Sequence, residues 1–331
     1  MTTEAPPRQP EASSSAGGIT EIKPLTGRVA GFLRGIPTWL LWFFVVVWTI
    51  PTLGLLINSF RTRDAQRGSG WWMFWQDSAN GYGGLTLENY RDILGSNATG
   101  GVANGLLNSM AIAVVATIIP IAIAAFAAYA FAWIDFRGRN LLFIATVALL
   151  AVPSQVALIP LLQMYAGGAH FTIPLIDKTL TVFPDLDLAG TIPAVWLTHT
   201  GFALPFAIFL LHNYISGLPS DLFESARIDG ADHFTIFRKI VVPLSVPVLA
   251  AFTIFQFLWT WNDYLIALTM IGGNREALPA TVVVASLAGE FGLREELLTA
   301  GAWIITVVPL IVFFALQRFF VRGITAGSVK G

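Results

Sequence analysis

The sequence contains no cysteine and little charge, and these two absences exclude whole classes of protein. Because none of its 331 residues is Cys, a disulfide framework, a thiolate metal site and a cysteine nucleophile are all impossible. Charged residues make up 12% of the chain, about half of the roughly 25% that a soluble domain carries. The net charge of -1 gives no reason to expect nucleic acid as a partner.

The chain also lacks the residue patterns that common catalytic sites require. It has no phosphate-binding loop ending in Gly-Lys-Ser or Gly-Lys-Thr, so ATPase activity would have to come from another protein. With four His residues it offers no His-rich metal cluster, and neither a catalytic carboxylate pair nor a nucleophile with its base can be found. We therefore expect no enzyme activity, and no metal or cofactor bound by this chain.

Long apolar runs are what the sequence does contain. Hydrophobic residues make up 55% of the chain, and the mean hydropathy is +0.68. A membrane-crossing helix needs about 20 apolar residues to span roughly 30 Å of hydrocarbon. Six such runs predict an all-α, polytopic membrane protein with spans at Pro37–Asn58, Asn104–Trp133, Leu141–Tyr165, Thr191–Tyr214, Val246–Ile271 and Thr299–Phe320.

The distribution of basic residues predicts that both chain ends are cytoplasmic. In that orientation twelve of the 19 Lys and Arg residues fall inside and seven outside, although Arg61, Arg63 and Arg67 oppose it locally. Residues 1–30, rich in Pro and Ser, are expected to form a disordered cytoplasmic tail before a transmembrane domain at 31–322. Residues 323–331 form a C-terminal tail, for which order and disorder both remain open.

The first outer loop, 61–103, is long and rich in tryptophan. Trp71, Trp72 and Trp75 lie close together in it, with Phe74 between them. An interfacial aromatic belt explains this cluster, and a docking surface for a soluble partner is the alternative.

The cytoplasmic segment 217–244 combines acidic, small and apolar residues in an order that favours a helix, a turn and a second helix. Ser220 is a plausible N-cap, and Gly230 permits a bend that a residue with a Cβ would resist. After the turn, Phe234, Ile236 and Phe237 are expected to form an apolar face. Such a motif is suited to docking against a soluble partner. The alternative interpretation is an ordinary loop between two spans.

The run from Glu224 to Ala231, followed by Ile240 and the pair Pro243-Leu244, resembles the signature loop of binding-protein-dependent ABC importer permeases. Ser225 stands where Ala is commoner in that loop. Four further stretches resemble the second permease subunit of the carbohydrate, maltose-type group: Leu85–Tyr90, Asn108–Ser109, Trp259–Tyr264 and the C-terminus from Gln317. The resemblance covers roughly residues 30–331.

This resemblance implies a type I ABC importer permease in a bacterial cytoplasmic membrane. Its implied partners are a second, different permease, a homodimeric or paired ABC ATPase that uses ATP and Mg, and an extracytoplasmic sugar-binding protein. The implied ATPase-coupling residues are Glu224, Ser225, Ala226, Asp229, Gly230, Ala231 and Phe234. The implied C-terminal ATPase contacts are Thr325, Gly327 and Lys330, and a loop that probes the binding protein is expected at Gly289, Glu290 and Phe291.

Polar residues inside the spans are the candidates for the translocation path, because polar groups in a membrane are costly and face a cavity or a partner helix. These candidates are Gln155, His199, Gln256, Trp259, Asn262 and Asp263. Hydrogen bonding between helices is the competing explanation for each of them.

The function expected from the residues and the resemblance is sugar import, with α-glucosides or other di- and oligosaccharides as substrates. A self-sufficient secondary transporter of a neutral solute is the alternative. Such transporters show internal repeats and ionisable groups near the middle of the membrane. Here we find no repeat, and Asp263 is almost the only acidic residue within the spans.

Overall fold

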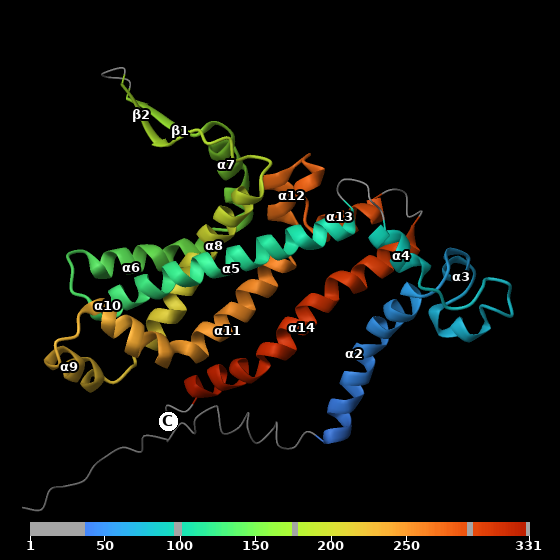
Figure 1. Cartoon of the computed structure of the whole chain (residues 1–331), viewed down its shortest axis with the longest axis horizontal. Helices are drawn as coiled ribbons and strands as arrows, with labels where there is room; N and C mark the ends of the chain where they lie inside the picture. The colour runs from blue at the N-terminus through green and yellow to red at the C-terminus, as the bar shows by residue number, and fades with distance from the viewer. Residues whose placement is uncertain (1–36, 96–100, 174–177, 290–293, 329–331) are drawn as a thin grey trace, which may run out of the picture. The chain divides into compact units, whose positions relative to one another are not determined.

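The computed structural model describes residues 37–95, 101–173, 178–289 and 294–328, and these residues are predominantly helical. The chain divides into two units, residues 1–53 and 54–331. Within the described residues, the first unit contributes the start of helix α2 (Thr38–Ser59), and the remaining elements belong to the second unit (Figure 1). The expected tail at 1–30 lies outside the described residues.

The elements after α2 alternate between long apolar helices and short connecting pieces. In chain order they are α3 (Arg63–Gly68), a 3-10 turn (Trp71–Gln76), α4 (Glu88–Gly95), α5 (Val102–Trp133), α6 (Arg139–Ala148), a 3-10 turn (Leu149–Ala151), α7 (Ser154–Gly167), β1 (Ala169–Ile173), β2 (Lys178–Phe183), α8 (Ile192–Ile215), α9 (Ser220–Ile228), α10 (His233–Ile236), a π-helical turn (Phe237–Val241), α11 (Val242–Trp261), α12 (Leu265–Ile271), a 3-10 turn (Arg275–Ala277), α13 (Ala280–Gly289) and α14 (Glu295–Ser328).

In the described part of the chain, five helical stretches are long and apolar enough to cross a membrane. They are Thr38–Ser59, Val102–Trp133, Ile192–Ile215, His233–Trp261 and Glu295–Gln317. Four of the six expected spans are thus confirmed as continuous helices, with bounds that differ by at most four residues from those expected. The expected all-α fold is confirmed in that the described residues are mostly helical, and β1 and β2 add one antiparallel hairpin.

The expected third span is not one helix. Arg139–Ala151 and Ser154–Gly167 meet at an angle of 104°. Pro153 sits at the bend as the N-cap of α7, and Val152 before it is extended. A proline disfavours helical backbone in the residue before it, which ends α6 and its 3-10 turn here. Prolines at 120, 160, 205 and 309 lie within α5, α7, α8 and α14 without ending them.

The expected fifth span, Val246–Ile271, is also interrupted. Its helix begins earlier, with α10, and ends at Trp261, and α12 begins four residues later, at Leu265. The Asp263 carboxylate accepts hydrogen bonds from the backbone N–H groups of Ile266 (3.3 Å) and Ala267 (2.9 Å). A side chain that caps new N–H groups starts a new helix, so the apolar run is divided here.

Small side chains hold the centre of the bundle together. On α5 the buried residues include Ala124 and Ala128, and on the facing α8 they include Ala203 and Ala207. Because hydrocarbon lipid supplies no hydrophobic drive between helices, close packing of small residues is the main source of association. α11 packs against both α5 and α14, and α13 packs against α5 and α14 at the opposite end of the bundle from α9 (Figure 1).

The segment between α2 and α5 folds around one buried ion pair. Arg61 is 1% exposed and Asp77 2% exposed, and Arg61 Nε lies 2.7 Å from Asp77 Oδ2. The same guanidinium also donates to the carbonyl of Ala65 at 2.8 Å. The hydrogen bond from Arg61 holds the pKa of Asp77 below its usual range. Of the aromatic cluster in this segment, Trp72 and Trp75 are exposed.

Candidate functional site

Two regions hold the candidate functional residues: a surface made by α9 and the turn after it, and a groove between α7 and α8. α9 begins at Ser220, and Pro219 precedes it as the N-cap. Ser220 is therefore the first helical residue and not the expected N-cap. Its hydroxyl lies 3.4 Å from an Asp221 carboxylate oxygen.

Gly230 makes the turn that follows α9. Its φ is +80°, a left-handed conformation that a residue with a Cβ adopts only under strain. The N–H of Ala231 donates to the carbonyl of Ala226 at 2.9 Å, and the N–H of Gly230 donates to that of Arg227 at 3.0 Å. These bonds satisfy carbonyls that would otherwise be left open at the helix end. The predicted helix, turn and second helix are all present.

Most of the predicted coupling residues lie on the surface of this motif. Glu224, Ser225, Asp229 and Gly230 are exposed, and Ala226 and Ala231 are half-buried. The expected apolar face after the turn is divided, because Ile236 and Phe237 are buried whereas Phe234 is 59% exposed. Ile228, at the end of α9, is 86% exposed. Two large apolar side chains thus stand at the surface on either side of Gly230.

An acidic side chain caps the helix after the turn. Asp232 Oδ1 accepts the backbone N–H of Thr235 at 2.9 Å. Its hydrogen bonds with Thr235 lower the pKa of the exposed Asp232 carboxyl. This surface therefore carries Glu224, Asp229 and a fixed Asp232 charge beside its two apolar side chains.

The groove is a cavity of about 690 Å³ on α7 and α8, with Trp259 of α11 in its wall. Tyr165, Phe202 and Trp259 contribute aromatic rings to it, and Gln155 and Thr198 contribute polar groups. Among the described residues, every side chain that lines this cavity is uncharged. Aromatic faces with a few hydrogen-bonding groups are suited to a neutral, hydroxylated ligand.

Behind Trp259 lies a fully buried histidine. The His199 ring meets the Trp259 ring edge to face, with centroids 5.5 Å apart. His199 Nε2 lies 3.6 Å from Asp263 Oδ2, and among the described residues neither ring nitrogen has a hydrogen-bond partner. His199 therefore packs against Trp259, and Asp263 lies beside His199.

The structure thus brings together Gln155, Trp259, His199 and Asp263, and of the other two path candidates only Gln256 lies apart from them. Gln256 is 1% exposed, and its Nε2 donates to the Ala116 carbonyl of α5 at 3.1 Å, so interhelical hydrogen bonding accounts for it. Asn262 is exposed and donates to the carbonyl of Leu258 in its own helix, and it lines a hollow of about 550 Å³ together with Trp259 and Asp263.

Sequence reasoning missed three groove residues, Tyr165, Thr198 and Phe202. The first two carried a signal, because each is a polar side chain within an apolar run. Thr198 Oγ1 donates to Tyr165 Oη at 3.4 Å across the groove wall. Phe202 carried none, since one phenylalanine among many in a span is indistinguishable from a lipid-facing side chain.

The remaining predicted site residues lie at the limits of the described chain. α14 continues through Thr325 and Gly327 to Ser328, and Lys330 lies outside the described residues. Gly289 is the last residue of α13, and Glu290 and Phe291 also lie outside them. Within the described residues, no group of three or more His, Asp or Glu side chains could hold a metal ion.

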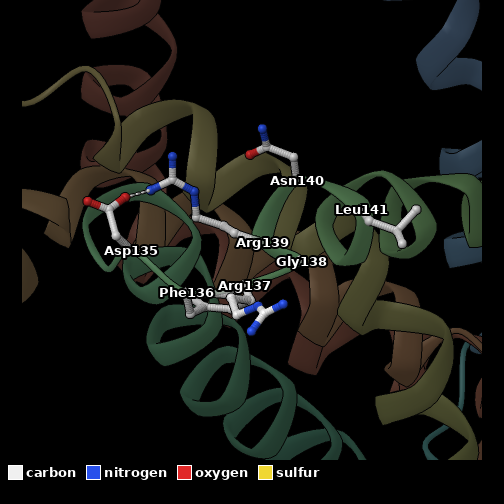
Figure 2. Close-up of a pocket in the computed structure, with 7 residues that line it drawn as sticks. All are labelled: Asp135, Phe136, Arg137, Gly138, Arg139, Asn140 and Leu141. Carbon is white, nitrogen blue, oxygen red and sulfur yellow. Dashed lines mark hydrogen bonds and ion pairs between the residues drawn. The ribbon is translucent and has the colours of Figure 1, made fainter.

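A second hollow, of about 510 Å³, lies in the connection between α5 and α6. Figure 2 shows Arg139 reaching back to Asp135, where an ion pair of 2.8 Å closes the connection. Arg137 points away from that pair (Figure 2). Gly138, with φ of +83°, makes the turn into α6. None of the path candidates lines this hollow.

Comparison with known proteins gives consistent matches along most of the chain. Residues 118–326 match the family model described as binding-protein-dependent transport system inner membrane component. The chain is 51% identical over 287 residues to the osmoprotective compounds uptake permease protein GgtD of Synechocystis sp., covering 86% of this chain and 88% of that protein.

Other proteins similar to this chain are named as sugar permeases. The α-glucoside transport system permease protein AglG of Rhizobium meliloti is 52% identical over 248 residues, which cover 75% of this chain and 61% of that protein. The trehalose transport system permease protein SugB of Mycobacterium tuberculosis is 34% identical over 75% of this chain and 83% of that protein. A crystal structure of a bacterial ABC transporter that imports alginate shares the fold, with a TM-score of 0.61 at 14% identity, covering 89% of this chain and 99% of its own.

Proposed function

The chain belongs to the family of binding-protein-dependent transport system inner membrane components, and from this premise we propose that it is one permease half of an ATP-driven sugar importer. It is a multi-pass protein of the bacterial cytoplasmic membrane and a permease subunit of an ABC importer. Its proposed substrates are α-glucosides or other di- and oligosaccharides, and a second, different permease completes the pathway.

The main observation that supports neutral sugars as the substrate class is the absence of charged side chains among the described residues that line the groove. A cavity of about 690 Å³ falls within the range of small-molecule sites, and its aromatic and amide groups suit sugar rings and hydroxyls. A phosphorylated or acidic sugar would lack a cationic partner among the described lining residues. The α-glucoside and trehalose permeases among the relatives support the same class.

The surface around Gly230 is the proposed contact with the ATPase. Exposed Ile228 and Phe234 would be covered by an apolar hollow on that partner, and the neighbouring acidic side chains would meet basic groups. Thr325, Gly327 and Lys330 are proposed as further ATPase contacts. The partner ATPase binds ATP and Mg, and its closure moves this surface and reverses the side on which the groove opens.

At the other end of the bundle, we place the extracytoplasmic binding protein near Gly289, Glu290 and Phe291. The alginate transporter that shares this fold was crystallised with a periplasmic protein that carries an alginate pentasaccharide. Both chain ends are cytoplasmic in this arrangement.

A mild-detergent pull-down of the full chain, with mass spectrometry of the recovered subunits, tests the importer. We expect a second permease and an ABC ATPase, and loss of the ATPase in Glu224→Lys, where the reversed charge opposes docking. If the chain is recovered alone and moves radiolabelled trehalose into liposomes without ATP, it is a secondary transporter instead.

A competition experiment then tests the substrate class. Uptake of radiolabelled trehalose should be reduced by unlabelled maltose and sucrose, which are neutral, and not by glucose 6-phosphate, whose charge the groove does not accommodate. Equal competition by the phosphorylated sugar would contradict the assignment to neutral sugars.

A further inference from the structure

We propose that two aromatic residues of α5, Tyr129 and Trp133, fasten α9 and the turn after it to the transmembrane bundle, so that the ATPase-facing surface and α5 move as one body. We call this set of contacts the aromatic clamp; its members are Tyr129, Trp133, Phe223, His233 and Phe237. The proposal rests on the proposed function, because it names the residues through which that surface acts on the pathway.

Trp133 forms the first half of the clamp. Its ring stacks on the ring of Phe223 in α9, with centroids 3.8 Å apart and planes at 16°. Phe223 is 1% exposed and is the one buried residue of α9. The indole N–H of Trp133 also donates to the carbonyl of Ile215, the last residue of α8, at 3.1 Å. One side chain of α5 thus holds both the end of α8 and the helix that follows it.

Tyr129 forms the second half, on the other side of the Gly230 turn. Its hydroxyl lies 3.0 Å from Nδ1 of His233, the first residue of α10. Its ring lies 5.6 Å from that of Phe237, which also stacks on Phe126 of α5 with centroids 4.4 Å apart. Residues four apart share one face of a helix. Trp133 therefore contacts the segment before the turn, and Tyr129 contacts the segment after it, from the same face of α5.

The opposite end of α5 is held by hydrogen bonds to the segment that leads into α13. Asn108 Nδ2 donates to the carbonyls of Glu276 (2.7 Å) and Leu278 (3.0 Å), which lead into α13. Ser109 Oγ accepts the N–H of Ala280, the first residue of α13, at 2.9 Å. α5 is 32 residues long and joins both ends of the bundle (Figure 1). A close-packed helix transmits a displacement instead of absorbing it, so motion at the clamp reaches α13.

The first test measures coupling in the assembled importer in proteoliposomes, as trehalose moved per ATP hydrolysed. Trp133→Ala should still bind the ATPase, yet lower this ratio about tenfold, and Tyr129→Phe about threefold, the range for losing one or two aromatic or hydrogen-bonding contacts. Trp133→Phe should restore most of the ratio, because it keeps a ring on Phe223. Phe131→Ala is the matched control, since Phe131 lies on α5 but packs on Phe143 of α6.

The second test needs no transported solute and uses the absence of cysteine in the chain. Spin labels at Leu222→Cys in α9 and Leu107→Cys in α5, both at exposed positions outside the residues proposed to contact the ATPase, report one distance along the bundle. This distance should stay narrow with and without ATP in the wild type, and broaden on ATP addition in Trp133→Ala.

Unchanged coupling in both Trp133→Ala and Tyr129→Phe, with an unchanged distance distribution, would overturn the clamp. If Trp133→Ala does not assemble, Tyr129→Phe decides the question, because it removes a single hydroxyl. Failure of the proposed function is distinguishable: the wild type itself would then recover no ATPase or show uptake without ATP.

Discussion

At the scale of single residues, burial decides which polar side chain has a structural role and which can meet a ligand. The side chains of Arg61 and Asp77 are both nearly inaccessible to solvent, and each neutralises the charge of the other in an ion pair. Breaking such a buried pair from one side is costly, because it leaves an uncompensated charge in an apolar surrounding. The pair therefore organises the whole connection between α2 and α5, including the exposed tryptophans that follow it.

Arg61→Ala should accordingly destabilise that connection by about 3–5 kcal/mol, the cost of leaving the Asp77 carboxylate buried without its partner. Chymotrypsin cleavage near Trp72 and Trp75 would become much faster in this variant. Arg63→Ala, at an exposed position two residues away, serves as the control and should cleave like the wild type. Equal resistance of Arg61→Ala would show that the ion pair does not hold the loop.

Trp259 and Gln256 lie on the same helix, yet the structure assigns them different roles. Trp259→Ala removes a ring from the groove wall and should raise the KM for trehalose about tenfold, the loss expected for one aromatic contact. Gln256→Leu removes a hydrogen bond to α5 and should lower thermal stability by about 1 kcal/mol while leaving KM unchanged. An equal KM change in both variants would contradict this division.

At the scale of elements, the turn after α9 has a matched counterpart elsewhere in the chain. Gly230 and Gly138 both have positive φ, and an added Cβ would meet no atom within 4 Å at either position. Replacing either by Ala therefore introduces backbone strain alone, of about 1–2 kcal/mol. Gly230→Ala should lower trehalose transport per ATP, because it distorts the ATPase-facing surface, whereas Gly138→Ala should not. Measuring both ratios in one preparation separates lost coupling from lost stability.

The elements also show how far sequence reasoning reaches. Continuous apolar runs predicted α2, α5, α8 and α14, because a membrane-spanning helix needs little beyond length and hydropathy. The acid, small and glycine order at 224–231 predicted the helix and turn of the surface around Gly230. Long-range contacts escaped prediction: nothing near Arg61 points to Asp77, and nothing near Trp133 points to Phe223. The breaks at Pro153 and Asp263 were missed because a hydropathy average over a whole span changes little when one residue is a proline or a helix cap.

At the scale of the whole molecule, the bent pair α6 and α7 decides the number of crossings. The Phe143 ring of α6 lies 4.2 Å from that of His212, near the end of α8. Tyr165 of α7 instead contacts Thr198, near the start of α8. Those two α8 positions are about 21 Å apart along the helix axis at 1.5 Å per residue. The pair thus contacts α8 at two well separated positions, which favours a single bent crossing over a re-entrant loop.

With both chain ends cytoplasmic, as proposed, six crossings would place the β1–β2 hairpin outside and the α5–α6 connection inside. The absence of cysteine makes this arrangement directly measurable. Single cysteines at Ser78, Thr172 and Asn140, all exposed, can be challenged in spheroplasts with a membrane-impermeant maleimide. Ser78→Cys and Thr172→Cys should react in intact spheroplasts, and Asn140→Cys only after permeabilisation. If α6 and α7 instead formed a re-entrant loop, Thr172→Cys would react together with Asn140→Cys. Every later segment would then change sides, and the surface around Gly230 would face away from the ATP-containing compartment. The label at Thr172 therefore tests the crossing number and the coupling surface at once.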